Sequence, residues 1–363
     1  MNVVSMHKLL MGEGKYPTEY FHQTANYILE LQEADGAIPW EAGSIVDPWD
    51  HVEAAMGLGV AGETRAARHA FEWLMNLQRD DGSWWAAYKS GEAVDTSRVE
   101  SNFVAYVATG VWHYYLVSQD KQFLADCWPM VAKAMAFIES MQSPHGEIYW
   151  AMDAKTGINK DALVTGCCSI YKSLECAVNI ARELGHDHST LARMRLSLGC
   201  ALRTKPERFD RTWDSKSRYS MDWFYPVLTG VYLDGEARKR LQSRWHEFVE
   251  PELGCRCVAD EPWVTIAESC ELTMALLAAG EQTKARALFS WLHAFRLEDG
   301  SWWTGYVFTD KVLWPDERPT WTAGAVLLAA DALTSHTAAS RLFTEHISDE
   351  KTLEQAAGLD LQL

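Results

Sequence analysis

One phrase of eight residues, Asp-Gly-Ser-Trp-Trp-x-x-Tyr, occurs twice in this chain, at 81–88 and again at 299–306. Weaker echoes, each with a Gly followed by a Trp, occupy 35–40 and 145–150. Every copy follows a stretch with helical periodicity and precedes a second, more apolar stretch. The first and last copies start 264 residues apart, which is about five steps of roughly 53 residues, a spacing typical of helical hairpins. The repeat therefore predicts a chain built from helical hairpins, which bury their apolar faces against one another.

Six hairpins of this size would nearly fill the 363 residues. Apolar residues at i, i+3, i+4 and i+7 mark outer helices, and inner helices are apolar on every face. We expect the outer helices at about 18–33, 64–78, 121–142, 188–205, 235–250 and 282–296, and the inner helices at about 50–60, 99–117, 161–184, 221–233, 265–279 and 320–334. The alternation predicts an all-α fold, a single (α/α)6 toroid of residues 1–335 followed by a C-terminal extension, 336–363.

The links from outer to inner helices are long, at 14 to 24 residues, whereas the links from inner to outer helices are short. Loops that long in a compact domain are usually functional. In a toroid they share one rim, at the N-terminal ends of the inner helices, where the helix dipoles favour carboxylates. Many of the 17 tryptophans fall in these loops, and an indole can stack on a sugar ring or face a cation. The rim is therefore the expected position of a binding site.

Charge and cysteine content exclude several classes of partner. A formal net charge of −17 argues against a nucleic-acid partner, which needs a basic face. No run of 18 apolar residues is present and residues 1–15 lack a secretory signal, so we expect no transmembrane segment and a cytoplasmic protein. The eight cysteines are then expected to be reduced and mostly buried. Cys255-x-Cys257 has the wrong spacing for zinc, and we predict neither a metal nor a cofactor.

Part of the repeat resembles the Gln-Trp repeat of triterpene cyclases and protein prenyltransferases. The likeness rests on Gln78-Arg-Asp-Asp-Gly82-Ser-Trp84 and extends over a few turns in four of the six repeats. It implies a shared way of joining helices. The Asp-x-Asp-Asp acid of class II terpene cyclases has no match in the sequence, and the Asp, Cys and His zinc set of the prenyltransferases has no convincing one.

A broader resemblance, over about residues 81–333, is to the six-hairpin glycosidases such as glucoamylase and trehalase. Segments 100–115 and 123–138 are similar to the inner and outer helices that flank the acid loop of those enzymes. Gly146-Glu-Ile-Tyr-Trp150-Ala-Met-Asp153 resembles the acid loop itself, although glucoamylases have glutamates after the Trp where this chain has Asp153. Glu317-Arg-Pro-Thr-Trp321-Thr-Ala resembles their last loop, which carries the catalytic base. The resemblance implies a glycosidase with Asp153 as the acid and Glu317 as the base.

Inverting glycoside hydrolysis needs two carboxyls about 6.5–9.5 Å apart, one protonated and one that activates water. Asp153 and Glu317 belong to loops three and six, which face each other across a six-fold ring. Two simpler roles stay open, because Asp153 can cap its own turn and Glu317 can pair with Arg318. Asp222 and Glu268, within the starts of inner helices, are the other catalytic candidates, because a buried carboxylate is costly without a partner.

Further residues on the same rim are candidates for substrate binding. For the Trp pairs at 84–85 and 302–303, the alternative is that they wedge hairpins together. For Asp50, the alternative is a residue favoured by the helix dipole. The predicted substrate-binding set is Trp49, Asp50, Trp84, Trp85, Glu100, Asn102, Trp150, Trp223, Trp302, Trp303 and Trp321.

The sequence favours an enzyme acting on a carbohydrate or glycoconjugate, by glycoside hydrolysis in a central cavity, with a small-molecule or oligosaccharide substrate. A terpenoid or prenyl cyclase or transferase with an aromatic cavity is the first alternative. A non-catalytic carbohydrate-binding scaffold is the second. The lining of the cavity distinguishes the glycosidase from the terpenoid or prenyl enzyme. A sugar site disperses polar groups among its aromatic side chains, whereas a carbocation site has apolar walls with one acid.

Overall fold

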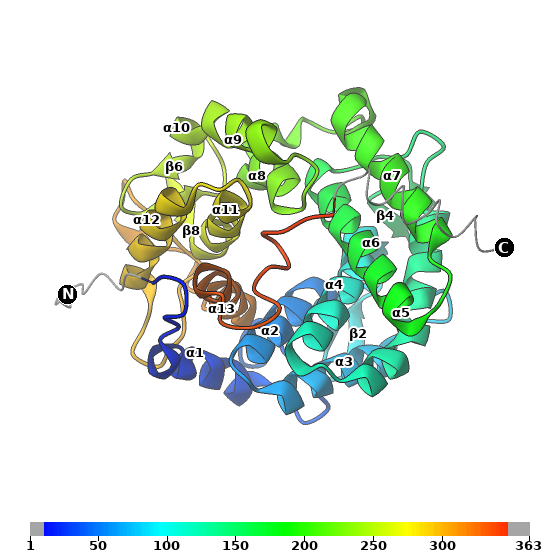
Figure 1. The fold of residues 1–363 in the computed structure, drawn as a ribbon, viewed down its shortest axis with the longest axis horizontal. Coiled ribbons are helices and arrows are strands. Elements are labelled where there is room, and N and C mark those ends of the chain that lie inside the picture. The colour runs from blue at the N-terminus through cyan, green and yellow to red at the C-terminus, as the bar shows by residue number, and fades with distance from the viewer. Residues whose placement is uncertain (1–10, 348–363) are drawn as a thin grey trace.

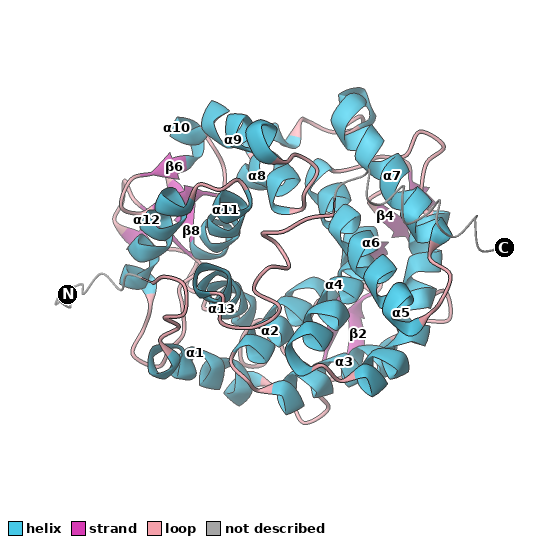
Figure 2. Ribbon diagram, viewed as in Figure 1, coloured by secondary structure: helices cyan, strands magenta, loops and turns pink. Residues whose placement is uncertain are grey.

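The computed structural model describes residues 11–347, which form mostly helices (Figures 1 and 2). The outer helices are α1 (Thr18–Leu31), α3 (Thr64–Leu77), α5 (Lys121–Ser140), α7 (Ser189–Thr204), α9 (Asp234–Ser243), the short α10 (Trp245–Phe248) and α12 (Gln282–Leu292). The inner helices are α2 (Pro48–Val60), α4 (Ser101–Ser118), α6 (Val164–Leu184), α8 (Ser220–Leu228), α11 (Ile266–Ala278) and α13 (Thr320–Thr334). Every helix expected from the apolar periodicity is present, so the helical class is confirmed.

The inner helices pack in chain order around a centre, and the outer helices lie outside them (Figure 1). In the described part of the chain α2 contacts α4, α4 contacts α6, α6 contacts α8, α8 contacts α11, and α11 contacts α13. Helix α13 also contacts α2, the first of the set. Glycines permit this last approach, since a Cβ at Gly57 of α2 would lie 2.7 Å from the Cα of Gly324 in α13.

Each of the four copies of the repeat joins one outer helix to a neighbouring outer helix. The side chain of Gln78 donates to the carbonyl of Gly82 within its own turn and to the carbonyl of Met130 in α5. Gln32 and Gln142 make the equivalent pairs of bonds. The repeat Gly has a positive φ and rests on the backbone of the next outer helix, so a side chain there would clash. In the last copy, Gly300 rests on the backbone of α1.

Short antiparallel strands occupy the long loops, and the sequence analysis did not predict them (Figure 2). One sheet pairs β1 with β2, a second has the order β3-β4-β5, and a third has the order β10-β9-β8-β7-β6. The strands are β1 (Ala87–Lys89), β2 (Glu92–Asp95), β3 (Arg98–Glu100), β4 (Ala151–Asp153), β5 (Gly157–Asn159), β6 (Val249–Glu250), β7 (Gly254–Arg256), β8 (Trp263–Thr265), β9 (Gly305–Val307) and β10 (Val312–Leu313). Strands of two to four residues are too short to produce an alternating pattern that sequence analysis can detect.

Hydrogen bonds link each long loop to the next. Strands β3 and β4 join loops two and three, and β8 and β9 join loops five and six. The carbonyl of Trp40 in the first loop accepts the backbone N–H of Thr320, at the end of the sixth, at 2.8 Å. The loops therefore lie together at the N-terminal ends of the inner helices, as the helix alternation predicts.

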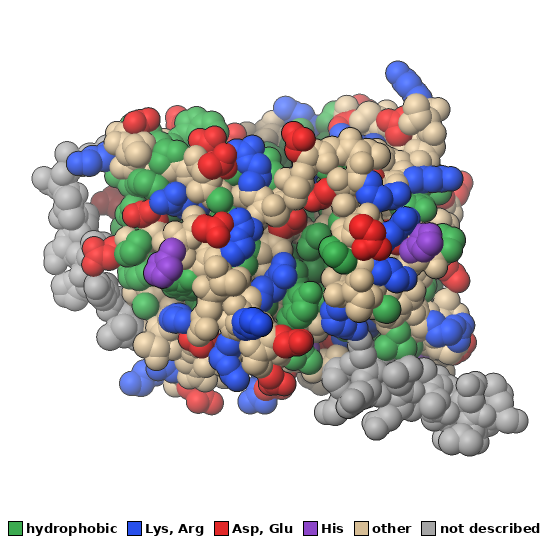
Figure 3. Space-filling model, turned by 90° about the horizontal axis from the view of Figure 1, so that it is seen from above, with side chains coloured by type: hydrophobic (Ala, Val, Ile, Leu, Met, Phe, Trp, Pro, Cys, Tyr) green, Lys and Arg blue, Asp and Glu red, His purple; other side chains and the backbone are tan. Residues whose placement is uncertain are grey.

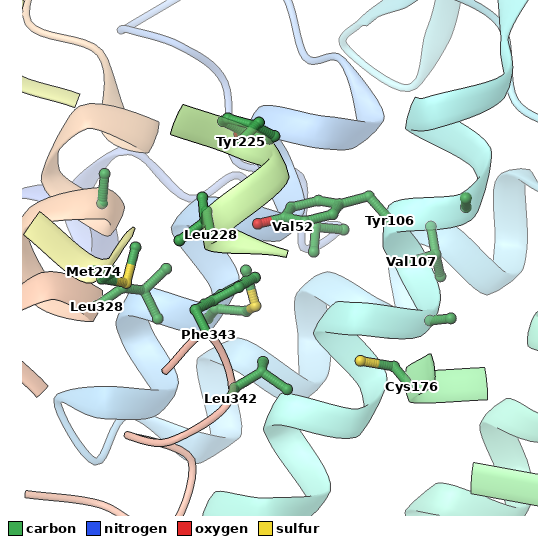
Figure 4. Close-up of a cluster of buried hydrophobic side chains, with 14 of the residues drawn as sticks. Val52, Tyr106, Val107, Cys176, Tyr225, Leu228, Met274, Leu328, Leu342 and Phe343 are labelled. Atoms are coloured by element: carbon green, nitrogen blue, oxygen red, sulfur yellow. The ribbon is translucent and has the colours of Figure 1, made fainter. Parts of the chain in front are cut away.

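The chain after α13 returns to the centre of the ring. Leu342 and Phe343 are buried there, near Tyr225 and Met274 (Figure 4). A side-chain bond from Arg195 to the carbonyl of Ile347 holds the segment in place. The described part of the predicted C-terminal extension thus packs inside the ring, and the rest of that extension, 348–363, lies outside the described residues.

Figure 3 shows acidic and basic side chains interspersed over the face that it draws. No helix within residues 11–347 has the length and apolar character needed to cross a lipid bilayer.

Candidate active site

A cavity of about 260 Å³ lies at the N-terminal ends of the inner helices. All six inner helices contribute to it, with residues from their caps or first two turns. Acidic and amide groups alternate with aromatic and aliphatic side chains around the wall. The lining residues are Trp49, Asp50, Glu53, Glu100, Asn102, Phe103, Leu163, Thr165, Gly166, Met221, Ala267, Glu268, Glu271, Trp321 and Ala325. This mixed lining is the one expected of a sugar site and differs from a carbocation chamber with apolar walls.

Asp50 and Asp47 form a close carboxyl pair at the start of α2. Asp47 is the N-cap of the helix, and its Oδ1 accepts the backbone N–H of Asp50 at 3.0 Å. Its Oδ2 accepts the indole N–H of Trp40 at 2.6 Å. Burial, followed by the neighbouring Asp47, raises the pKa of Asp50 well above its ordinary value. Asp50 therefore faces the cavity with a carboxyl whose protonated form is favoured, which suits a proton donor.

Glu53 and Glu271 form the floor of the cavity, and each accepts a hydrogen bond from a tyrosine. The hydroxyl of Tyr106 donates to Glu53 Oε2 at 2.5 Å, and the hydroxyl of Tyr225 donates to Glu271. Both carboxyls are buried, and burial raises the pKa of Glu53 to about 7 and the pKa of Glu271 well above its ordinary value. Trp49 stacks on Tyr106, with ring centroids 4.7 Å apart. The floor is thus a hydrogen-bonding surface of two carboxyls whose ionisation is opposed by burial.

Glu268 and Glu100 differ in what binds their carboxylates. Glu100 is held by Arg98, whose Nε lies 2.7 Å from its Oε1. Glu268 is half-buried on the first turn of α11 and receives a hydrogen bond from the thiol of Cys257. Within residues 11–347 it has no ion pair and no bond from a tyrosine. Glu268 therefore presents to the cavity a carboxyl that no cation or tyrosine of the described residues holds.

Six of the residues that the sequence singled out meet in this cavity. Glu268 was a catalytic candidate, and the others were candidates for substrate binding. The six residues are Trp49, Asp50, Glu100, Asn102, Glu268 and Trp321.

Three of the predicted substrate-binding tryptophans belong to the core, and the prediction for them is wrong. Trp84 and Trp302 are fully buried, and Trp223 is 2% exposed, so no ligand can stack on their faces. Their indole N–H groups bond inside the protein, Trp84 to the carbonyl of Leu74 and Trp302 to the hydroxyl of Thr24. These buried tryptophans fit the alternative role, in which the indoles pack between the hairpins.

The other three predicted tryptophans, at 85, 150 and 303, are half-buried but are not among the residues that line the cavity. The guanidinium of Arg79 lies 3.9 Å from the ring centroid of Trp85. Trp303 has Arg318 over its ring, at 5.6 Å.

The predicted acid and base, Asp153 and Glu317, do not line this cavity either. Oδ1 of Asp153 accepts the backbone N–H groups of Lys155 and Thr156, each at 2.8 Å. These bonds lower the pKa of Asp153, which is the wrong direction for a general acid. The side chain therefore caps its own turn, the simpler role left open for it. Glu317 follows the third sheet, and its backbone carbonyl accepts the N–H of Thr304 at 3.1 Å.

Asp222 lies behind the cavity wall. Thr165, which lines the cavity, donates to its Oδ1 at 2.7 Å, and burial raises the pKa of Asp222 to about 6. The sequence analysis assigned neither Glu53 nor Glu271 to the site, and both lie in the second turn of largely apolar inner helices. A carboxylate inside such a helix was itself the available signal, since it is costly to bury without a partner.

No protein-family model matches the chain. It is 47% identical over 330 residues to the MMP endo-(1,4)-3-O-methyl-alpha-D-mannosidase of Mycolicibacterium hassiacum (strain DSM 44199 / CIP 105218 / JCM 12690 / 3849), an alignment that covers 91% of this chain and 90% of that protein.

Among solved structures, a glycosidase matches 86% of this chain and 96% of its own, with a TM-score of 0.70 and 14% identity. A D-mannose isomerase matches with a TM-score of 0.66 and 10% identity, over 86% of this chain and 95% of its own. A sugar epimerase from a ruminal bacterium matches with a TM-score of 0.65 and 12% identity, over 86% and 98%. At these identities the likeness describes the fold alone.

Proposed function

The chain belongs to the glycoside hydrolase family of the Mycolicibacterium hassiacum MMP endo-(1,4)-3-O-methyl-alpha-D-mannosidase, and we propose that it hydrolyses internal (1,4) bonds of a polysaccharide of 3-O-methyl-α-D-mannose. The observation that carries the proposal is the pairing in one cavity of Asp50, a carboxyl whose pKa is raised, with Glu268, a carboxyl that no cation or tyrosine of the described residues holds. Helix α13 lies between the helices that present them, α2 and α11. The two groups thus flank Trp321, which lines the cavity from the first turn of α13.

In this proposal Asp50 is the general acid. Its proton goes to the glycosidic oxygen as the bond from that oxygen to the anomeric carbon breaks. The burial and the nearby Asp47 that raise the pKa of Asp50 favour its protonated form, which is the form that a general acid needs. Asp47 does not face the cavity, and its part is to position Asp50 through the helix cap and to oppose its ionisation.

Glu268 is then the general base. It takes a proton from a water molecule whose oxygen bonds to the anomeric carbon, so that one molecule of water is consumed per bond cleaved. The cavity lining supports this role, because Glu268 is held only by a thiol, whereas Glu100 is paired with Arg98. The positive ends of the inner-helix dipoles meet at the same place and favour the charged carboxylate.

Sugar hydroxyls find hydrogen-bond partners at the floor and wall of the cavity. The floor carboxyls of Glu53 and Glu271 and the amide of Asn102 offer donors and acceptors, and burial opposes the ionisation of both carboxyls. A neutral polysaccharide fits this lining better than an anionic one.

The apolar part of the wall supports a methylated substrate. A methyl ether replaces a hydroxyl donor with a small apolar group, which is stabilised by contact with hydrophobic side chains. Trp49, Phe103, Leu163, Met221 and Trp321 supply such surface between the carboxylates.

Several wider features belong to the same proposal. The loop and helix contacts support a closed (α/α)6 toroid, with 336–363 as its C-terminal extension. Free thiols at all eight cysteines are consistent with work in a reducing cytoplasm. The dispersed polar lining and the mannosidase relative favour a glycosidase over a terpenoid or prenyl enzyme.

The direct test is to incubate the purified chain with (1,4)-linked 3-O-methyl-α-D-mannan and to follow the products by mass spectrometry. The proposal expects oligosaccharides of intermediate length first, because the attack is internal. An unmethylated (1,4)-α-mannan of equal length is the control for the methyl groups. Release of single sugars from one end, or no cleavage, would show that the proposed activity is wrong.

A further inference from the structure

The exposed large apolar side chains of residues 11–347 gather in the long loops of the cavity rim. They are Val94, Ile158, Tyr219, Val312 and Trp314. Trp314 is the only tryptophan among them and is 54% exposed. The active site described above uses none of the five, so the exposure of a whole indole at this rim has no explanation in the reaction itself.

Trp314 is built into a rigid pair with Trp263. The indole N–H of Trp263 donates to the backbone carbonyl of Trp314 at 2.8 Å, and the two rings meet edge to face with centroids 5.1 Å apart. Gly305 makes room for the arrangement, since any Cβ there would clash with the Trp263 indole. An exposed side chain held this firmly loses little conformational entropy when a ligand stacks on it.

The pair is continuous with the cavity through the backbone on both sides. Trp263 begins β8, which leads without a break into α11 and to Glu268 in its first turn. Trp314 follows β10, and the chain after it reaches Trp321 at the start of α13. Strand β8 pairs with β9, and β9 pairs with β10. One sheet therefore places both indoles beside the chain segments that lead into α11 and α13, which line the cavity.

Acidic side chains outnumber basic ones in the loop segments that carry the pair. Glu261, Asp310 and Asp316 are exposed there, and the cations are Lys311 and Arg218, which pairs with Glu261. This balance favours a neutral ligand over a phosphate or sulfate group. A neutral sugar is such a ligand, and the C–H face of a pyranose packs well on an indole.

We propose that Trp314, held by Trp263, is an outlying carbohydrate subsite that binds a sugar unit of the same polysaccharide at a distance from the bond being cleaved. This inference rests on the proposed function, because the sugar unit bound at Trp314 belongs to the substrate named there. Such a subsite suits an enzyme that cuts inside long chains, because contact far from the bond selects a long chain over a short one.

The test is a series of (1,4)-linked 3-O-methyl-α-D-mannose oligosaccharides of increasing length, used with the wild type, Trp314→Ala and the control Val94→Ala. Val94 is equally exposed, at 55%, on the separate β1–β2 hairpin. For the longest chains we expect kcat/KM of Trp314→Ala to fall about 10-fold, the equivalent of roughly 1.4 kcal/mol of stacking. The loss should arise in KM and shrink as the chains become shorter, and Trp314→Phe should restore part of the affinity.

Binding of the same oligosaccharides, measured by calorimetry, separates the subsite from the reaction. If the wild type binds long chains more tightly than Trp314→Ala but cleaves none, the subsite stands and the proposed hydrolysis fails. If the wild type cleaves the chains and Trp314→Ala matches it at every length, the subsite is wrong and the hydrolysis stands. Self-association of the wild type that Trp314→Ala abolishes in analytical ultracentrifugation would also overturn the subsite, because the pair would then be a contact between copies.

Discussion

The carboxyl groups of Asp47 and Asp50 meet at the first turn of α2, where Asp47 Oδ1 accepts the backbone N–H of Asp50 at 3.0 Å. One carboxyl caps the helix and the other faces the cavity. Burial raises the pKa of both carboxyls. The charge of Asp47 makes it harder still for Asp50 to ionise, whereas the hydrogen bonds from Asp50 favour the ionised form of Asp47. A helix cap and a proton donor are thus parts of one arrangement.

Asp47→Asn should shift the pH profile of the enzyme. Asn is as good an N-cap as Asp, so the helix start is expected to survive. Loss of the negative charge lowers the pKa of Asp50, and the reaction requires Asp50 protonated. The alkaline limb of kcat/KM should therefore move to lower pH, while Asp153→Asn, on a remote turn, leaves it in place. If the alkaline limb of Asp47→Asn stays at the wild-type pH, Asp47 does not influence the pKa of the catalytic acid.

Glu53 should make the protein less stable as the pH rises. Its pKa in the folded chain is raised to about 7, above the ordinary value of 4.5, so the folded state favours the protonated form. This contribution is complete below the ordinary value and is lost as the pH rises through 7, to the extent of about 3 kcal/mol. Urea unfolding between pH 4.5 and 8 should show a smaller fall for Glu53→Gln than for the wild type. The exposed Glu19→Gln is the control, and an equal fall in all three proteins would contradict the buried titration.

Trp84 should matter for stability, because it is a core residue at a repeat turn. Trp84→Ala removes a fully buried side chain and its bond to the carbonyl of Leu74, and it should lower the free energy of unfolding by about 3–5 kcal/mol. Val94→Ala, on an exposed hairpin, should change it by less than about 0.5 kcal/mol. A Trp84→Ala protein as stable as the wild type would mean that this indole does not support the hairpin.

The cysteines give a test by thiol titration. Cys200 is exposed and Cys257 is half-buried, while the other six thiols are buried, which raises their pKa values wherever a shift is seen. Native protein should show one fast-reacting thiol, absent in Cys200→Ser, and eight thiols after denaturation without reductant. Two or fewer in the denatured, unreduced protein would mean that disulfides are present.

The fold could be predicted from the sequence because its signals are local and repeated. The apolar periodicity of the inner helices and the Asp-Gly turns each specify one hairpin, and the structure places the helices within a few residues of the predicted ranges for most of the chain. The exceptions are instructive. The helix expected at 235–250 is divided into α9 and α10, and α8 ends at Leu228, two residues after Pro226.

The site was only partly predictable, because it depends on which side of a turn each side chain faces. Trp84 and Trp85 are adjacent in a motif rich in loop residues, yet one is in the core and the other lies under Arg79. Asp153 matched the position of a family acid but caps its turn. Glu268 could be recognised because a carboxylate in an apolar helix is costly to bury without a partner. The same argument applied to Glu53 and Glu271 would have identified the floor of the cavity.

The most direct test of the account is the activity of Asp50→Asn and Glu268→Gln on (1,4)-linked 3-O-methyl-α-D-mannan, with Asp153→Asn and Glu317→Gln as matched controls. Each variant of the first pair removes one proton-transfer group with little change in shape, so turnover should fall about 10²–10⁴-fold while the melting temperature stays close to that of the wild type. The controls, which lie outside the cavity lining, should keep turnover near that of the wild type. Near-normal turnover by Asp50→Asn or Glu268→Gln, or a loss confined to Asp153→Asn and Glu317→Gln, would contradict the assignment of acid and base.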